Sequence, residues 1–274
     1  MEPDIEVNSA RNYKMLGFTD YHTHTVMSDG SANYETMVRA AIEKGLDEIG
    51  FSDHVCLKPV TWAIEEIDLP VMTHQIMEIR EKYDHLISVK YGIELDYFPG
   101  KEEELNKIIN SLPLDYVIGS LHFIGDWNFD GDKSLYGKWP NDELYAMYYE
   151  LIQQMAASNL FDIIGHLDII KKFAVYPESD LTHLYAETAR IIKTSGSVVE
   201  LNTGGLDRPC AEFNPGQPWL EILHAESIPV TITSDAHHPD QIARHFPGAI
   251  DLLRKIGYTE ITTFTKRRRG SLKI

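Results

Sequence analysis

The sequence predicts an α/β fold, a barrel of parallel strands, on three observations. Short apolar, β-branched runs alternate with longer stretches in which apolar residues recur every three or four positions, as at Met37, Ala40 and Ala41. A helix after each strand implies parallel strands joined by right-handed crossovers. We count seven strand–helix units, which favours a closed barrel over an open sheet. The length of 274 residues is ordinary for one barrel-sized domain.

The predicted elements cover most of the chain. We expect strands at residues 19–26, 48–54, 88–97, 116–123, 162–169, 197–203 and 229–237, with a last short strand at 260–264. We expect helices at residues 33–44, 71–86, 101–111, 142–158, 181–194, 219–226 and 239–255. The longest irregular stretch, 124–141, has a length that is usual for functional or disordered loops. One domain over residues 1–274 is predicted, with the barrel at about 19–264, a short N-terminal extension and a solvated basic tail at 266–269.

The composition excludes several classes of partner. Lys and Arg total 25 and Asp and Glu total 42, so the formal net charge is −17. Such a charge argues against nucleic acid or an anionic membrane as the main partner and leaves room for bound cations. The sequence has no apolar run of about 18 residues, which a membrane span would need. Because the first residues also lack a signal-peptide pattern and the two cysteines make no disulfide framework, we expect a cytoplasmic protein.

Half of the 12 histidines stand at the ends of predicted strands. In a parallel barrel the carboxyl ends of all strands lie on one rim, so these imidazoles would converge there. A single histidine at such a place is more often a hydrogen-bonded core residue, but six together indicate metal ligands. Two pairs of candidate ligands, His22 with His24 and Asp235 with His237, are spaced two apart, which directs both side chains of an extended pair to one side. The six are His22, His24, His54, His122, His166 and His237.

Acidic residues follow the same pattern. Asp29 follows His24 in a turn-like segment, Glu94 stands at a strand end, and Asp235 lies two positions before His237. Imidazole with carboxylate suits zinc, manganese or iron. Asp53 and Asp168 are open to two interpretations, because each could orient an imidazole or cap a loop. The sequence therefore predicts a metal site at the C-terminal rim of the strands.

The motifs that carry these residues resemble, in order, those of the PHP (polymerase and histidinol phosphatase) superfamily. Members form a distorted, TIM-like (β/α)7 barrel, which agrees with the seven units. Within the superfamily, the chain length and the aromatic segment SLHFIGDWNFD (120–130) resemble the stand-alone histidinol-phosphatase group. The matching segments are HTHTVMSDG (22–30), GFSDH (50–54), GIELDY (92–97), GSLHFI (119–124), GHLD (165–168), ELNTGG (200–205) and TSDAHHP (233–239).

The resemblance implies two or three divalent ions, which would be zinc, manganese or iron. Asp29 departs from some relatives, which carry histidine near that place, and this puts the occupancy of the third site in question. By position, the first ion would be held by His22, His24, Glu94 and Asp235, the second by Glu94, His122 and His166, and the third by Asp29, His54 and His237.

The resemblance also implies the reaction, which is hydrolysis of L-histidinol phosphate to L-histidinol and phosphate in histidine biosynthesis. We expect direct attack by a hydroxide that bridges two ions, with Glu94, Asp235 and His237 as catalytic residues. Lys171 and Arg208 would bind the phosphate, and Trp127, Phe123 and His238 would contact the rest of the substrate. Each of these five has a simpler interpretation. Lys171, like its neighbour Lys172, could be part of a solvated helix start, and Arg208 could form a loop ion pair. The aromatic residues could be the core of a lid, and His238 could be a rim residue.

Three other functions remain open at this stage. One is a PHP phosphoesterase for a nucleotide, a phosphotyrosyl protein or a short oligonucleotide. Another is a metal-dependent amidohydrolase, which would not need Lys171 and Arg208. The last is a non-catalytic metal-binding module, which the complete ligand set disfavours. The sequence leaves the oligomeric state and the identity of the metal undetermined.

Overall fold

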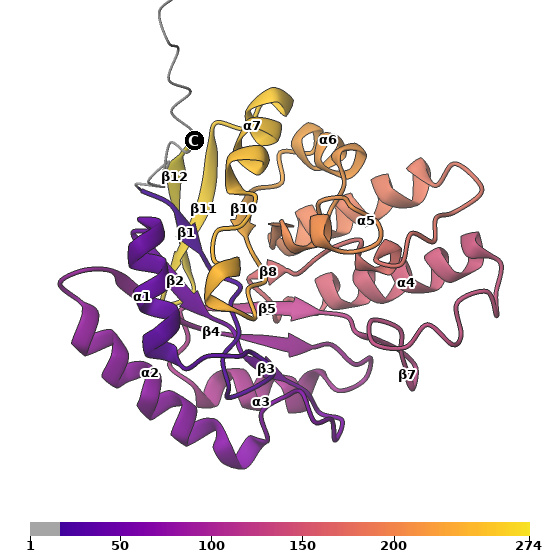
Figure 1. The fold of residues 1–274 in the computed structure, drawn as a ribbon. Helices are drawn as coiled ribbons and strands as arrows, with labels where there is room; N and C mark the ends of the chain where they lie inside the picture. Colours follow the sequence, from indigo (N-terminus) through magenta and orange to yellow (C-terminus); the bar gives the residue numbers. More distant parts are fainter. Residues whose placement is uncertain (1–16) are drawn as a thin grey trace, which may run out of the picture.

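The computed structural model describes residues 17–274, and its core is a nearly closed sheet of seven parallel strands (Figure 1). A parallel bridge between Thr23 and Ala236 joins the ends of the first and last strands, with Ala236 N donating to His22 O at 3.1 Å. The predicted (β/α)7 barrel is thereby confirmed. In sheet order the strands are β1 (Thr19–Asp20), β2 (Glu48–Phe51), β4 (Ser88–Asp96), β5 (Tyr116–Ser120), β8 (Ile163–Ile164), β9 (Val198–Asn202) and β10 (Val230–Thr233), and β3 (His54–Val55) also pairs with β4.

Helices alternate with the strands and cover the outside of the barrel (Figure 1). The first begins where the Asn33 side chain accepts a hydrogen bond from Thr36 N and ends at Gly45, whose φ of 80° is the left-handed conformation that glycine adopts without strain. Its Met37 and Ala41 side chains are buried against the sheet layer. The helices are α1 (Tyr34–Lys44), α2 (Leu69–Tyr83), α3 (Glu102–Ser111), α4 (Asn141–Ala157), α5 (Thr182–Ser195), α6 (Gln217–Ala225) and α7 (Phe246–Ile256).

Aromatic side chains fill the inside of the barrel. Tyr21, Tyr116 and Phe264 are fully or almost fully buried in one cluster. The ring of Tyr116 lies directly against Gly92 of β4, where a Cβ atom would overlap it. Glycine at this position therefore makes room for a filled, close-packed barrel interior.

The basic residues 266–269 are exposed, as the sequence predicts, but they belong to a hairpin that the sequence analysis did not predict. Strands β11 (Glu260–Thr265) and β12 (Arg268–Lys273) pair in antiparallel fashion. Lys266 N donates to Asp115 at 2.9 Å and Arg267 Nε donates to Asp162 at 2.8 Å. Since both acceptors immediately precede barrel strands, the hairpin covers the amino end of the barrel, opposite the strand ends that carry the histidines.

The helix expected at 239–255 is two elements, η4 (Pro239–Gln241) and α7. Ala243 and His245 interrupt it because their φ angles, 55° and 58°, are left-handed. At this break Arg244 donates to Ser234 O and Asp235 O, both at 2.9 Å. The interruption thus brings the Arg244 guanidinium against the backbone oxygen of Asp235, a predicted metal ligand.

Short elements occupy the remaining connections. The irregular stretch 124–141 begins within a small hairpin, in which β6 (Phe123–Ile124) pairs with β7 (Trp127–Asn128). The short helices η1 (Glu66–Asp68), η2 (Ile169–Lys171) and η3 (Gly204–Asp207) follow β3, β8 and β9. The predicted N-terminal extension lies largely outside the described residues. Among the residues that are described, none of the helices has the length and apolarity to cross a membrane.

Candidate metal centre

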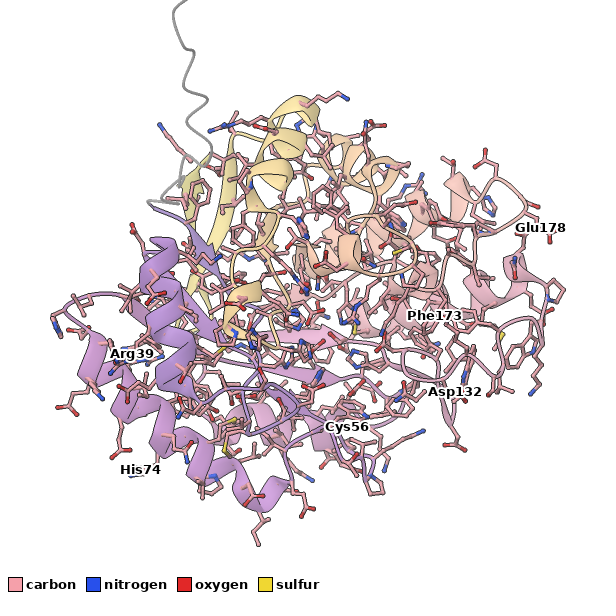
Figure 2. The ribbon with its side chains drawn as sticks, in the orientation of Figure 1. Arg39, Cys56, His74, Asp132, Phe173 and Glu178 are labelled. Carbon is pink, nitrogen blue, oxygen red and sulfur yellow. The ribbon has the colours of Figure 1, made fainter. Side chains whose placement is uncertain are left out.

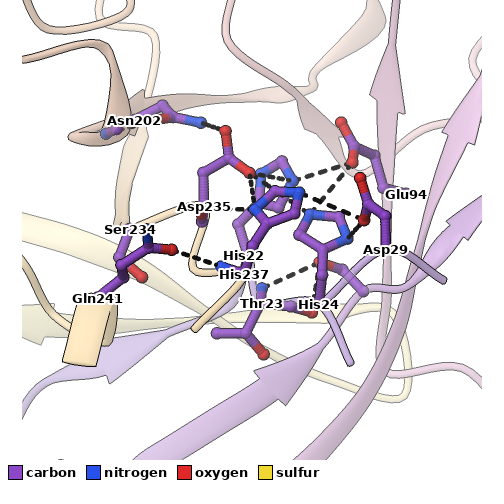
Figure 3. A network of polar contacts seen from close by, with 12 residues as sticks. His22, Thr23, His24, Asp29, Glu94, Asn202, Ser234, Asp235, His237 and Gln241 are labelled. Carbon is purple, nitrogen blue, oxygen red and sulfur yellow. Dashed lines mark hydrogen bonds and ion pairs between the residues drawn. The ribbon is translucent and has the colours of Figure 1, made fainter. Parts of the chain in front are cut away.

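The nine predicted metal ligands meet at the carboxyl end of the barrel, and six of them are labelled in Figure 3. Seven of them, all except His22 and His24, line a cavity of about 290 Å³, near the lower end of the range for small-molecule sites. The local cause is topological. β1 and β10 both end at this rim, and the Thr23–Ala236 bridge brings His22 and His24 beside Asp235.

Glu94 of β4 lies at the centre of the cluster. Its Oε2 is 3.0 Å from His22 Nε2 and 2.9 Å from His54 Nδ1. Its Oε1 is 2.9 Å from His166 Nε2 and 3.7 Å from His122 Nε2. A buried carboxylate whose two oxygens face imidazoles on both sides is suited to bridge two cations.

Two further carboxylates complete the ligand set. Asp235 Oδ1 lies 3.4 Å from His24 Nε2. Asp29 Oδ1 lies 3.3 Å from His237 Nε2 and 3.7 Å from His54 Nε2. Three subsets have their ligand atoms within 4.8 Å of one another: His24, Asp29, His54 and His237; His22, His24 and Glu94; His54, Glu94 and His122.

Unpaired buried atoms show that these residues fit a cation. Both ring nitrogens of His24, and Glu94 Oε2, are buried without a hydrogen bond. Leaving such atoms unpaired costs about 1–3 kcal/mol each, and a bound cation would satisfy them. The structure thus supports a metal centre through the donor set itself.

The electrostatics of the cluster place two of its residues, His24 and Asp29, in the forms that bind metal, whereas for His22, His122 and His237 the neighbouring carboxylates outweigh burial and raise the pKa. Burial and the nearby His237 and His54 lower the pKa of His24 to about 3, so this imidazole is neutral at pH 7. Burial opposes ionisation of Asp29, but the hydrogen bond from His237 and the proximity of His54 outweigh it and lower its pKa to about 2. Neutral imidazole and ionised carboxylate are the ligating species.

Two buried carboxylates hold the rings of metal-ligand histidines from behind. Glu200 Oε2 is 2.9 Å from His22 Nδ1, and Asp96 Oδ1 is 2.9 Å from His122 Nδ1. Such contacts fix the tautomer and the orientation of a ligating ring. The sequence analysis did not assign this role to either residue. A signal was present for Glu200, a charged residue inside the otherwise apolar run SVVEL.

The two aspartates left open by the sequence hold loops. Asp53 accepts from Thr25 N at 2.6 Å, Ser28 Oγ at 2.7 Å and Tyr34 OH at 2.8 Å, and so shapes the turn that carries Asp29. Of the two interpretations, the structure places Asp53 in the loop-capping one. Asp168, likewise, accepts from Gly216 N at 2.9 Å.

Of the two adjacent lysines, Lys172 faces the cavity. Arg208 also lines it. Lys171 is buried elsewhere, with its Nζ 2.8 Å from Asp168 and 2.9 Å from Glu212. The irregular short helix η2 separates the directions of the two side chains, so the structure does not bring Lys171 to the cavity.

The predicted aromatic contacts lie away from the cavity. Trp127 packs inside its own loop, where its Nε1 donates to Asp132 O at 2.9 Å. Phe123 packs on Trp62, with ring centroids 6.2 Å apart. Trp62 itself lines the cavity and was missed, because nothing in its local sequence marks it. His238 is exposed and its Nδ1 accepts from Asp240 N to begin η4.

Comparison with known proteins agrees with this architecture. A family model, the PHP domain, matches residues 20–204. A probable histidinol-phosphatase from Deinococcus radiodurans is 30% identical over 254 residues, covering 90% of this chain and 97% of that protein. The histidinol-phosphatase of Lactococcus lactis subsp. lactis is 25% identical over 258 residues, covering 90% and 94%. A crystal structure of histidinol phosphate phosphatase from this organism, complexed with zinc, L-histidinol and phosphate, superimposes with a TM-score of 0.82 at 24% identity, covering 93% of this chain and 99% of that one.

Proposed function

The chain belongs to the PHP domain family, and from that premise we propose that it hydrolyses L-histidinol phosphate to L-histidinol and phosphate. The observation that carries this proposal is the cavity, where the imidazole and carboxylate cluster stands beside Arg208 and Lys172. Cationic side chains bind phosphate oxygens, and a cluster of divalent ions can activate water and neutralise charge on phosphate, so this combination suits hydrolysis of a phosphate ester. The named relatives support the substrate, and the reaction belongs to histidine biosynthesis.

The metal centre would take two or three divalent ions on the nine ligands, as zinc, manganese or iron. When bound, such ions lower the pKa of a water and neutralise charge on phosphate oxygens. The protein's own part is to position them. Glu94 and Asp235 hold negative charge at the centre of the cluster, and His237 and Asp29 close its outer edge.

Arg208 and Lys172 would donate to the phosphate oxygens. The guanidinium offers two parallel N–H groups, and the ammonium offers a compact charge. We therefore assign to Lys172 the role that the sequence analysis gave to Lys171. Trp62, which packs edge-on against His54 and His122 at 4.8 and 5.5 Å, offers the aromatic surface for the substrate's imidazole. An amidohydrolase would have no need of the two cationic side chains.

We propose direct attack of water at phosphorus, without a phosphorylated protein. In the described part of the chain, no serine, threonine or cysteine lines the cavity, and its histidines belong to the ligand set. Hydrolysis in labelled water of an ester made chiral at phosphorus by oxygen isotopes should invert the configuration. Retention would indicate two displacements and overturn this step.

The decisive assay is phosphate release by protein of measured metal content. L-Histidinol phosphate should exceed p-nitrophenyl phosphate, nucleotides and phosphotyrosine in kcat/KM by about a hundredfold or more, which corresponds to roughly 2.7 kcal/mol of transition-state binding. A flat or reversed profile with metal bound would retain a phosphoesterase site and reject this substrate.

A further inference from the structure

One carboxylate in the cavity, that of Asp130, has no place in the ligand set. It follows β7 and lines the cavity beside Asn128 and Gly131. Its side chain is 24% exposed, so it faces the cavity without projecting into bulk solvent. Asp132, two residues along the same loop, is exposed and points away from the molecule (Figure 2).

The charge of Asp130 is held in a fixed place. Lys172 Nζ donates to its Oδ1 at 2.6 Å and to its backbone oxygen at 3.0 Å. Its second oxygen, Oδ2, makes no hydrogen bond with the residues that the structure describes. The loop therefore presents a free acceptor oxygen beside the lysine proposed to bind phosphate.

The proposed substrate needs such an acceptor. L-Histidinol phosphate carries an ammonium group on the carbon adjacent to its ester carbon, within one small cavity of the phosphate. The other carboxylates lining this cavity, within the described residues, are Asp29, Glu94 and Asp235, and all three belong to the predicted ligand set. Asp130 is the remaining carboxylate that can pair with a cation.

We propose that Asp130 binds the ammonium group of the leaving alcohol through Oδ2. It would thereby select phosphate esters whose alcohol carries an ammonium group over esters whose alcohol lacks one. Asp130 and Lys172 together form a paired recognition element, in which the lysine meets the phosphate and the aspartate meets the amine. This inference rests on the proposed function and names the group that determines its specificity.

The test compares two esters that differ only in the amine: L-histidinol phosphate and 3-(imidazol-4-yl)propyl phosphate. In the unaltered protein the ratio of their kcat/KM values should be about tenfold or more, the value of a charge-assisted hydrogen bond. Asp130→Asn should reduce this ratio to below threefold. Asp132→Asn, the same charge change on the exposed side of the loop, should preserve it, and equal metal content is verified in each sample.

Inhibition constants separate recognition of the amine from support of Lys172. With p-nitrophenyl phosphate as the reporter substrate, Asp130→Asn should raise the inhibition constant of L-histidinol about tenfold and that of inorganic phosphate less than threefold. If phosphate inhibition weakens while the ester ratio is preserved, Asp130 only holds Lys172 and the inference is overturned. Should Asp130→Asn fail to fold, Asp130→Glu, which keeps the charge and displaces it, should lower the ratio, and an unchanged ratio overturns the inference.

The two proposals fail in different ways. If the unaltered protein shows no preference for L-histidinol phosphate over p-nitrophenyl phosphate, the proposed function fails, and the ligand assigned to Asp130 fails with it. If the preference exists and Asp130→Asn retains the full effect of the amine, only the inference about Asp130 is overturned.

Discussion

Two adjacent lysines should separate catalysis from stability. Lys172 Nζ reaches the cavity, whereas Lys171 Nζ is bound to Asp168 in a pair whose side chains are 5% and 6% exposed. We predict that Lys172→Met lowers kcat/KM with the smaller loss of stability of the two, because its pair with Asp130 is more exposed, at 13% and 24%. Lys171→Met should mainly lower stability and leave kcat/KM little changed. Methionine is an apolar side chain of similar length, so the substitution mainly removes the charge that is paired with Asp168.

The magnitudes follow from the two environments. A hydrogen bond to a charged group contributes about 1.5–3 kcal/mol, so losing the Lys172 contact to phosphate should lower kcat/KM about 10- to 150-fold. Removing one partner of a buried ion pair costs about 3–5 kcal/mol. At roughly 2–4 °C per kcal/mol for a chain of this size, Lys171→Met should lower the Tm by about 6–20 °C. Asp168 keeps its bond from Gly216 N, which favours the lower part of that range.

The assay measures both quantities on both variants. Steady-state kinetics with L-histidinol phosphate gives kcat/KM, and calorimetry at the same pH gives the Tm. A loss of kcat/KM greater than tenfold in Lys171→Met, at unchanged Tm, would refute the assignment. It would also return the phosphate contact to the residue that the sequence favoured.

Three further outcomes are expected. Glu200→Gln should weaken metal binding about 10- to 100-fold in chelator competition, since it removes the charge that orients His22; unchanged affinity would show that the ring is oriented by other contacts. Stripping the metal should lower the Tm by about 8–16 °C, the equivalent of about 4 kcal/mol at a thousandfold excess over Kd, and zinc or manganese should restore it; a Tm indifferent to metal would contradict the ligand set. Gly92→Ala should cost about 1–3 kcal/mol in urea unfolding, because the new methyl group overlaps the Tyr116 ring; an unchanged midpoint would mean that the ring can move aside.

The order of the strands and the convergence of the candidate metal ligands on one rim were predictable from the sequence because both depend on short-range periodicity. The strand ends were not, since the strands predicted to end at residues 26, 169 and 237 end at Asp20, Ile164 and Thr233. A residue two positions from a ligand in extended chain shares its direction, as with His22 and His24. The residues proposed to contact the substrate were harder to predict from the sequence. Lys171 and Lys172 differ by one position in a short irregular helix, where spacing does not determine direction, and Trp62 reaches the cavity only through the path of a long loop.

A charged residue inside an apolar strand is a further signal that can be read from the sequence. Glu200 interrupts a buried strand, and such a residue must find a partner because an unpaired buried charge is costly. Its partner, His22, lies 178 positions away in the sequence. The sequence alone therefore indicates that Glu200 is paired, whereas the fold is needed to name the partner.

Closure of the barrel and assembly of the metal centre depend on the same few residues. β1 and β10 meet through the Thr23–Ala236 bridge, and the ligands His22, His24 and Asp235 flank that bridge directly. Asp235 has a φ of 53°, a conformation that non-glycine residues adopt at a cost. Arg244 stabilises it by donating to its backbone oxygen. A cation bound to these ligands would favour the conformation in which β1 and β10 are joined. By linkage, that conformation must favour binding of the cation. The barrel is therefore closed beside the predicted metal ligands, and bonds from Ser234 N and Ala243 N to the buried Asp20 side chain hold β1 there as well.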